Sequence, residues 1–401
     1  MRNEFIPLSV PNFKGRELEY VTKAIRNEWV STAGEYVAEF ENKISKYLNV
    51  ENAVACQSGT AGLHLALKLA GVSYGHEVIV PTLTFIATVN PVKYLGAEPV
   101  FMDCDDTLNM DLDKLEEFCT KECTLTEEGL KNKRTDKIIK AVVIVHVFGN
   151  MACMERVIDI ADRFKIKIVE DATEALGSYS TKGRYKGKFA GTIGDFGVYS
   201  FNGNKIITTG GGGILVTKEK DLARRAKYLS SQAKDDELYY IHNEIGYNYR
   251  MTNLQAALGL AQLEQLEEFI RIKTRNYNFY KEGLESIEGL TLLEFNKNTR
   301  PNYWFYSLLI DDKIYGINRD ELLKALAKDK IQTRPIWGLI HCQKPYKNNQ
   351  TYKIEKAEYY LERILNLPCS TNLGKSEIMY IIEVLKSIKD KRVFLKKTKR
   401  G

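Results

Sequence analysis

Short strand patterns alternate with helical patterns from residue 53 to residue 231, and this alternation limits the possible folds more than any other feature of the chain. Runs of apolar and β-branched residues predict the strands, and apolar residues at helical spacing predict the helices between them. Strand–helix–strand units of this kind join parallel strands by right-handed connections. We therefore expect an α/β fold with a mainly parallel mixed sheet between helices.

The expected elements follow from these patterns. The predicted strands of this region are Ala53–Cys56, Glu77–Pro81, Pro99–Asp103, Ala141–Phe148, Lys167–Val169, a run from Phe196 that breaks at Asn202-Gly203, and Ile214–Thr217. The predicted helices of the first 231 residues are Gly15–Asn27, Tyr36–Leu48, one from Ser58 to about Ala70, Thr84–Leu95, Met154–Phe164 and Asp221–Ser231.

The length of 401 residues predicts two domains, because a single core seldom grows so large. We expect a large domain over residues 1–255 with an extended N-terminal arm, and a smaller C-terminal α+β domain over residues 256–401. A long helical pattern that starts near Thr252 and continues past Tyr280 is expected to bridge them. We interpret the polar segment 112–138 as an insertion between strands.

Composition excludes several classes of protein. The net charge of +6, from 58 basic and 52 acidic residues, is too small and too evenly spread for a nucleic-acid-binding protein. Seven scattered cysteines and only five histidines give no metal-binding spacing, and they are typical of the reducing cytoplasm. The N-terminal residues lack the apolar segment of a signal peptide, and no apolar run reaches the roughly 18 residues of a membrane span.

Chemically useful side chains follow several predicted strands. Ser58, Asp171 and Ser200 stand at or just after strand ends, and Lys205 follows the Asn202-Gly203 break. In a parallel sheet, ligands bind at the carboxyl ends of the strands, so these side chains are expected to share one site. Each has an ordinary interpretation by itself, as a helix cap or a solvated lysine. Their occurrence together, in this order, favours a common function.

The common function that they suit is the binding of an aromatic aldehyde that carries a phosphate and a pyridine ring. Backbone amides of Gly59 and its neighbours at a helix N-terminus, with the Thr60 hydroxyl, suit the phosphate. The Asp171 carboxylate suits a protonated ring nitrogen, and Phe85 could stack on the ring face. The Lys205 amine suits an imine with the aldehyde, provided that it is held away from water.

The chain resembles the DegT/StrS family of sugar-nucleotide aminotransferases, which are pyridoxal-phosphate enzymes of fold type I. The resemblance extends from about Ile6 to Lys386. The motifs that carry it are Trp29-Val30-Ser31-Thr32, Gln57-Ser58-Gly59-Thr60-Ala61, Pro81-Thr82-Leu83-Thr84-Phe85, Glu170-Asp171-Ala172-Thr173-Glu174-Ala175, Ser200-Phe201-Asn202-Gly203-Asn204-Lys205 and Gly246-Tyr247-Asn248-Tyr249-Arg250-Met251-Thr252.

The resemblance implies the cofactor pyridoxal 5'-phosphate and a role for each matching residue. Lys205 would form the imine and Asp171 would pair with the ring nitrogen. The phosphate would be bound by Thr60, Ala61 and Ser200, with Phe85 over the ring. Glu174 stands beside the phenolic oxygen of the cofactor, where many members carry Gln or His. Asn248 would reach the phosphate of the neighbouring subunit's cofactor, which implies a homodimer.

The resemblance also implies the reaction, in which glutamate gives its amino group, leaves as 2-oxoglutarate, and the amine passes to a nucleotide-linked keto sugar. The expected acceptor is a UDP-4-keto-6-deoxy-N-acetylhexosamine, with GDP- or dTDP-linked sugars and amination at C3 as alternatives. Arg250, from the partner subunit, is expected to bind the diphosphate, and Thr32 and His341 are expected to line the sugar pocket. Two competing functions are that of a dehydratase, which Lys205 disfavours, and that of a non-catalytic pyridoxal-phosphate-binding regulator.

Overall fold

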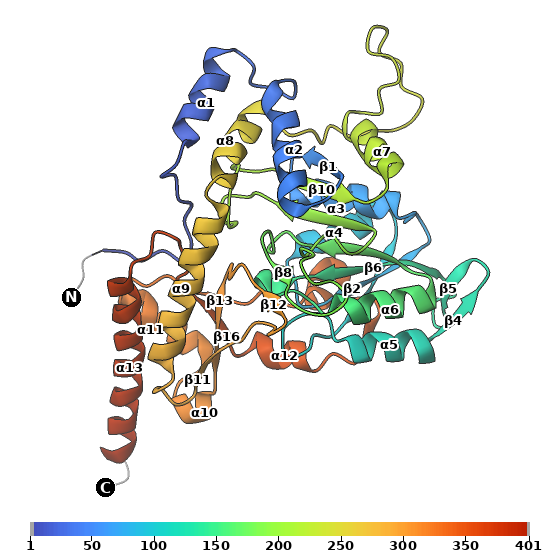
Figure 1. Ribbon diagram of the computed structural model, residues 1–401. Coiled ribbons are helices and arrows are strands. Elements are labelled where there is room, and N and C mark those ends of the chain that lie inside the picture. The colour runs from blue at the N-terminus through green and yellow to red at the C-terminus, as the bar shows by residue number, and fades with distance from the viewer. Residues whose placement is uncertain (1–3, 399–401) are drawn as a thin grey trace.

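The large sheet of the molecule is mostly parallel, as the alternating pattern predicts. The computed structural model describes residues 4–398 (Figure 1). Ten strands form this sheet, and eight of them follow one another in the order β1 (Asn52–Cys56), β10 (Gly213–Thr217), β9 (Phe196–Ser200), β7 (Lys167–Asp171), β6 (Ile138–Val145), β2 (Glu77–Pro81), β3 (Glu98–Met102) and β15 (Thr351–Tyr352). The hairpin of β4 (Cys123–Thr126) and β5 (Gly129–Asn132) pairs with β6.

The directions of these strands bring the carboxyl ends of β1, β9 and β7 to one edge. From β9 to β15 every neighbouring pair is parallel, whereas β10 runs antiparallel to both β9 and β1. Two successive reversals leave β1 pointing the same way as β9. The strands β2 and β10 are buried at all five positions, as expected of strands covered by helices on both faces.

Helices cover the sheet and mostly match their predicted bounds. Over residues 17–263 they are α1 (Glu17–Arg26), α2 (Glu35–Leu48), α3 (Gly59–Leu69), α4 (Asn90–Tyr94), α5 (Leu112–Lys121), α6 (Met154–Phe164), α7 (Lys220–Ser230) and α8 (Asn253–Leu263), with the short turns η1 (Ile86–Thr88) and η2 (Val147–Gly149). Figure 1 shows α5 and α6 side by side, and these two helices contact each other. Helix α3 packs on β10, β9 and β7 and begins at the edge where β1 ends.

Two sequence predictions need correction, and the structure adds detail to a third. The helix expected over Thr84–Leu95 is the short turn η1 followed by α4, since Pro91 lacks the N–H of an uninterrupted helix. The strand expected over Ala141–Phe148 ends at Val145, and Phe148 adopts a positive φ of 56° in the turn that follows. The segment 112–138 does lie between strands, but it is ordered as α5 and the β4–β5 hairpin, and it buries Leu115 and Phe118.

The long helix expected from Thr252 is two helices. A capping box between Thr252 and Gln255 starts α8 where the sequence predicts. The helix ends at Leu263, and α9 (Leu266–Leu284) starts after two polar residues. Both polar side chains bond to the N-terminal segment: Glu264 accepts from the Tyr20 hydroxyl at 2.8 Å and Gln265 donates to Glu17 at 2.7 Å. The arm of residues 4–16 and α1 are therefore attached at the break.

The C-terminal part forms a second layer of strands and helices. Its antiparallel sheet has the order β11 (Leu290–Leu292), β13 (Tyr306–Ile310), β16 (Ile364–Leu367) and β14 (Arg334–Pro335). Around it lie α9, α10 (Asp312–Tyr315), α11 (Arg319–Lys328), α12 (Lys356–Leu361) and α13 (Lys375–Thr398), with the turns η3 (Ile340–Cys342) and η4 (Lys344–Tyr346). A short ribbon of β8 (Tyr179–Ser180) and β12 (Thr299–Arg300) joins the two parts. Among the described residues, we find no helix that could cross a membrane.

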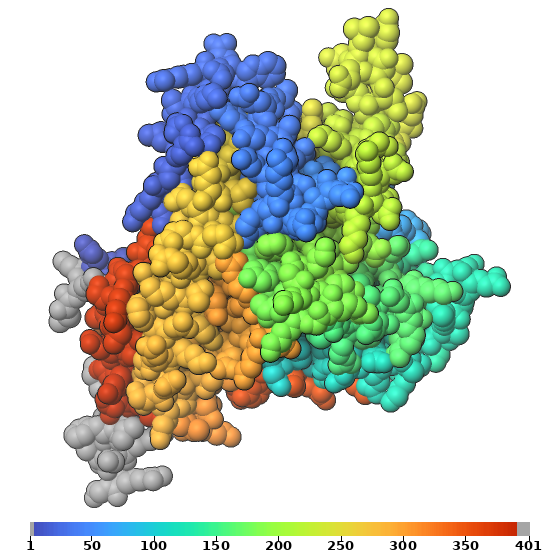
Figure 2. All heavy atoms as spheres, viewed as in Figure 1, coloured from blue at the N-terminus to red at the C-terminus, as the bar shows by residue number. Residues whose placement is uncertain are grey.

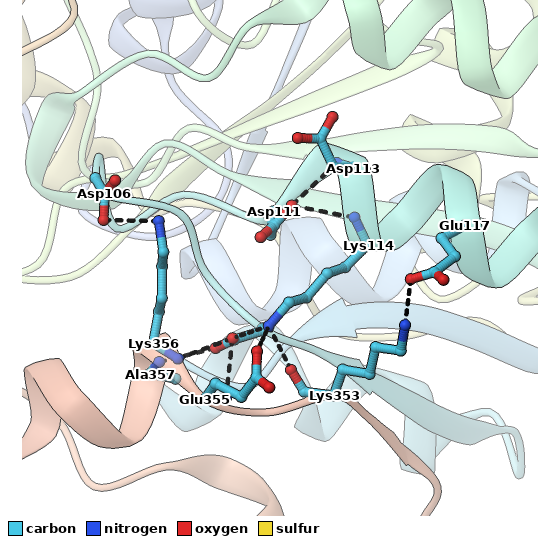
Figure 3. Close-up of polar contacts among 10 residues, drawn as sticks. Asp106, Asp111, Asp113, Lys114, Glu117, Lys353, Glu355, Lys356 and Ala357 are labelled. Carbon is cyan, nitrogen blue, oxygen red and sulfur yellow. Dashed lines mark hydrogen bonds and ion pairs between the residues drawn. The ribbon is translucent and has the colours of Figure 1, made fainter.

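A buried carboxylate, Asp103, attaches the C-terminal chain to the large sheet. Its oxygens accept the Lys114 ammonium at 2.7 Å and the backbone N–H groups of Glu355, Lys356 and Ala357 at 2.8–2.9 Å. Figure 3 shows Lys114 reaching from α5 to Glu355 and to the backbone of Lys353. Burial by itself would raise the pKa of Asp103, but hydrogen bonds from Lys114 and from the backbone N–H groups of Ala357, Lys356 and Cys104 outweigh it and hold the pKa below its usual range.

We predict that Asp103→Asn destabilises the protein by about 3 kcal/mol, because it leaves the Lys114 ammonium without its buried counter-charge. The exposed Asp106, which pairs with Lys356 at 2.8 Å, provides the control Asp106→Asn, whose effect should stay below about 1 kcal/mol. The measurement is urea unfolding followed by tryptophan fluorescence. Because the folded pKa of Asp103 is lowered, the difference should be full above about pH 5 and decline on acidification. Equal losses in both variants would contradict this assignment.

Candidate active site

A cavity of about 600 Å³ lies where the carboxyl ends of β1, β9 and β7 face the small sheet. Eight residues expected from the sequence line it: Ser58, Gly59, Thr60, Phe85, Asp171, Glu174, Ser200 and Lys205. The opposite wall comes from the C-terminal part and consists of Trp304, Phe305, Gln332, Arg334, Trp337 and Asn366. The prediction of a shared site at the strand ends is thus matched by one cavity between the two sheets.

Among the described residues, Lys205 is the one lysine that lines this cavity. It follows β9 in a turn closed by its own N–H, which donates to the Asn202 carbonyl at 3.0 Å. Its side chain is 13% exposed, and Nζ lies 3.7 Å from Oε1 of Glu174. Burial lowers the pKa of Lys205, and the negative charges of Glu174 and Asp171 oppose part of that effect. Such an amine is neutral in a larger fraction of molecules than a surface lysine, as imine formation requires.

Asp171 ends β7, the strand beside β9, and its carboxylate is almost fully buried. Oδ2 accepts from the Thr88 hydroxyl at 2.7 Å, and Oδ1 accepts from the Thr173 N–H at 3.1 Å. The Thr84 hydroxyl lies 2.8 Å from that of Thr88 and extends this chain of bonds. Thr88 is not among the residues predicted from the sequence. Its only sequence signal is a second threonine four positions after Thr84, in a segment wrongly predicted as one helix.

The start of α3 forms a narrow cradle opposite Ser200. Ser58 caps the helix, and its Oγ accepts the Ala61 N–H at 3.1 Å. A Cβ atom at Gly59 would lie 2.9 Å from Cβ of Ser200, so only glycine allows the helix N-terminus to approach Ser200 this closely. The N-terminus of a helix attracts anions, and the Thr60 and Ser200 side chains border the same space. The cradle suits a phosphate group.

Glu174 places a second carboxyl group in the cavity, and Oε2 accepts the Phe148 N–H at 2.9 Å. Burial raises its pKa to about 7, although Lys205 and the Phe148 N–H act in the opposite direction. Phe85 extends beside this site with about half of its side chain exposed. Phosphate cradle, carboxylate, amine and aromatic side chain are therefore gathered as an aromatic aldehyde with a phosphate would require.

Ala61, in the first turn of α3, does not line the cavity of the single chain, and its implied contact with the phosphate remains a prediction. Four further predicted residues also lie outside this cavity. Asn248 is exposed and pairs with Ser231, and Arg250 pairs with Cys56 beside the end of β1. Thr32 lies in the turn between α1 and α2. His341 lies in the turn η3, between β14 and β15, and its Nδ1 is 2.6 Å from the Thr82 hydroxyl. The roles that the resemblance implies for these four residues remain predictions.

Three comparisons place the chain among known proteins. The sequence pattern of the DegT/DnrJ/EryC1/StrS aminotransferase family matches residues 11–386. GDP-perosamine synthase of Escherichia coli O157:H7 is 38% identical over 381 residues, covering 95% of this chain and 97% of that protein. GDP-perosamine synthase of Caulobacter vibrioides is 36% identical, covering 96% and 98%. The solved PLP form of Spr1654 from Streptococcus pneumoniae is 26% identical, with a TM-score of 0.84 and coverage of 97% and 100%.

We predict that Glu174→Gln lowers the pKa of Lys205 by about one unit, because it removes the nearest negative charge while an amide oxygen can still accept the Phe148 N–H. The pKa is measured on the full-length protein freed of any cofactor, from the pH dependence of Lys205 acetylation followed by peptide mass spectrometry. The surface variant Glu116→Gln should leave it unchanged. An unchanged or higher pKa in Glu174→Gln would show that the ion pair does not control the amine.

Proposed function

This chain belongs to the DegT/DnrJ/EryC1/StrS aminotransferase family, and from that premise we propose that it transfers the amino group of glutamate to the keto carbon C4 of a GDP-linked sugar. The observation that carries the proposal is the position of Lys205. Its amine lies in the cavity beside the carboxyl group of Glu174, at the end of the strand next to Asp171.

The residues of the cavity fit pyridoxal phosphate as the cofactor. The α3 cradle at Gly59 and the hydroxyl of Ser200 would hold its phosphate, and Asp171 would hold its ring nitrogen. When bound, this cofactor supplies an aldehyde that carries the amino group and a ring that withdraws electrons from the adjacent carbon. An additional cationic group, Arg334, lines the same cavity and would attract an anionic substrate.

The protein's own groups control proton movement. The bonds from Thr88 and Thr173 fix the Asp171 carboxylate in place, where it would favour a protonated ring nitrogen in a bound cofactor. Lys205 Nζ, once free, is the base that takes a proton from the carbon bearing the amine and the acid that returns one to the acceptor carbon. Burial favours this exchange because it keeps the amine neutral in part of the molecules.

The nucleotide of the acceptor is the point at which the sequence prediction changes. The sequence predicts a UDP-linked N-acetylhexosamine, with a GDP-linked sugar as an alternative. Two relatives more than 35% identical over nearly the whole chain are named GDP-perosamine synthases, and these names support the GDP-linked alternative. We therefore infer a GDP-linked acceptor and keep the UDP-linked sugar as the competitor in the test.

A second copy of this chain is the partner that we infer. Asn248 and Arg250 lie outside their own cavity, near the end of the segment that connects α7 to α8. Part of this segment extends away from the body of the molecule (Figures 1 and 2). Large apolar side chains are exposed on this segment and on the turn before α2: Trp29, Leu238, Tyr239, Tyr240 and Ile245. Exposed apolar groups in such number are typical of an interface. In a dimer, Asn248 could serve the partner's cradle.

The expected result for Lys205→Ala is a loss of amino transfer of about a thousandfold or more, together with loss of the visible absorption of bound pyridoxal phosphate. In the unmodified protein, glutamate should shift that absorption to shorter wavelength. The control Lys218→Ala changes a lysine that bonds to the Ile193 carbonyl outside the cavity, and it should retain both properties. Visible absorption that persists in Lys205→Ala would contradict the assignment of the amine.

The unmodified protein can be used to identify the acceptor. After glutamate has been added and removed, a GDP-linked 4-keto sugar should restore the visible absorption faster than a UDP-linked or dTDP-linked one. A faster recovery with the UDP-linked sugar would overturn the choice of nucleotide while leaving the aminotransferase reaction intact.

Mixing two inactive variants tests the shared site. We expect Lys205→Ala and Asn248→Ala each to lower transfer, and mixed subunits to recover it. One site of the mixed dimer then has both its own Lys205 and Asn248 of the partner subunit. Activity after subunit exchange is the measurement, and each variant exchanged with itself is the control. Absence of recovery, with exchange verified by mass spectrometry, would show that Asn248 acts within its own chain or not at all.

A further inference from the structure

Trp304 contacts the environment of Lys205 in two ways. The Nζ atom of Lys205 lies 4.2 Å from the centre of the Trp304 ring, within the range of a cation–π interaction. The indole N–H of Trp304 donates to the carbonyl of Asn204 at 2.8 Å, and Asn204 is the residue directly before Lys205. One side chain of the C-terminal part therefore contacts both the amine and the backbone that carries it.

Trp304 is itself fixed on every side. Its side chain is almost fully buried. Its backbone N–H donates to Oδ1 of Asn302 at 3.0 Å, and its backbone carbonyl accepts from the buried Lys273 ammonium at 3.0 Å. Asn302 also donates to the carbonyl of Glu174 at 2.8 Å. The segment that holds Trp304 is thus bonded to the residue whose carboxyl group faces Lys205 from the other direction.

We propose that Trp304 is a positioning residue for Lys205: its ring face holds the ammonium form of the amine in the cavity, and its indole N–H fixes the turn from which the lysine extends. This inference rests on the proposed role of Lys205 as the group that moves protons. Nothing in the sequence motifs or in the names of the relatives assigns a role to this tryptophan.

An aromatic ring and a carboxylate differ in how they interact with an ammonium group. The charged groups that face Lys205 are Glu174, at 3.7 Å, and Asp171, and both can accept a proton. An aromatic ring attracts an ammonium group but cannot take its proton. Trp304 can therefore hold Lys205 while its proton remains available to the substrate, and the attraction ends when the amine becomes neutral.

The test measures Lys205 directly in the full-length protein without cofactor, by the pH dependence of its acetylation. Trp304→Leu removes ring and N–H, and we expect the pKa of Lys205 to fall by about one unit, which is about a tenfold change in the ratio of free amine to ammonium. Trp304→Phe keeps a weaker ring face and should give a smaller fall in the same direction. The matched control is Trp337→Leu.

Trp337 lines the same cavity and packs on Phe148 with ring centres 4.7 Å apart, so its loss opens a similar space. It should leave the titration of Lys205 unchanged. The proposal is overturned if Trp304→Leu titrates as the unmodified protein does, or if Trp337→Leu causes an equal fall. If Trp304→Leu does not fold, Trp304→Phe decides, and an unchanged pKa there overturns the proposal. Because acetylation needs neither cofactor nor substrate, this outcome is separate from a failure of the proposed reaction.

Discussion

Burial of a single amine beside two carboxyl groups is the interaction on which the rest of this site depends. Burial of Lys205 makes its neutral form accessible. The negative charges of Glu174 and Asp171 stabilise the ammonium form that remains. The strand order supplies the geometry, because β9 and β7 are parallel neighbours and β1 points the same way. An amine, a carboxylate and a helix N-terminus then meet at one edge of the sheet.

The second half of the site belongs to the other sheet, so the site is complete only when both parts are packed together. Trp304 and Trp337 face the strand ends across the cavity. Asp103 on one side, and Asn302 on the other, bind backbone groups of the opposite part with several hydrogen bonds each. The two parts thus share buried polar bonds, whose loss leaves unpaired groups and makes separation costly.

Local periodicity predicts the sheet well because buried parallel strands have a strong apolar signature. The residues that directly follow these strands must then lie at the carboxyl edge of the sheet. This is how Ser58, Asp171, Ser200 and Lys205 could be assigned to one edge. Trp304 and Arg334 could not, since they lie about 100 residues or more further along the chain and nothing local links them to that edge. The break in the helix at Glu264 also escaped prediction, because its cause is a contact with α1.

The parallel pairing of β15 with β3 has a consequence for how this chain can be divided. The strands β11, β13 and β14 of the small sheet come first in the chain. The next strand, β15, starts at Thr351 and belongs to the large sheet, and β16 after it belongs to the small sheet again. At the other end, Ile6 pairs with Ile331. The segments that form the large sheet and the small sheet therefore alternate along the chain, and neither sheet comes from one continuous stretch. Truncation near residue 255 would expose β3 as a bare, aggregation-prone edge.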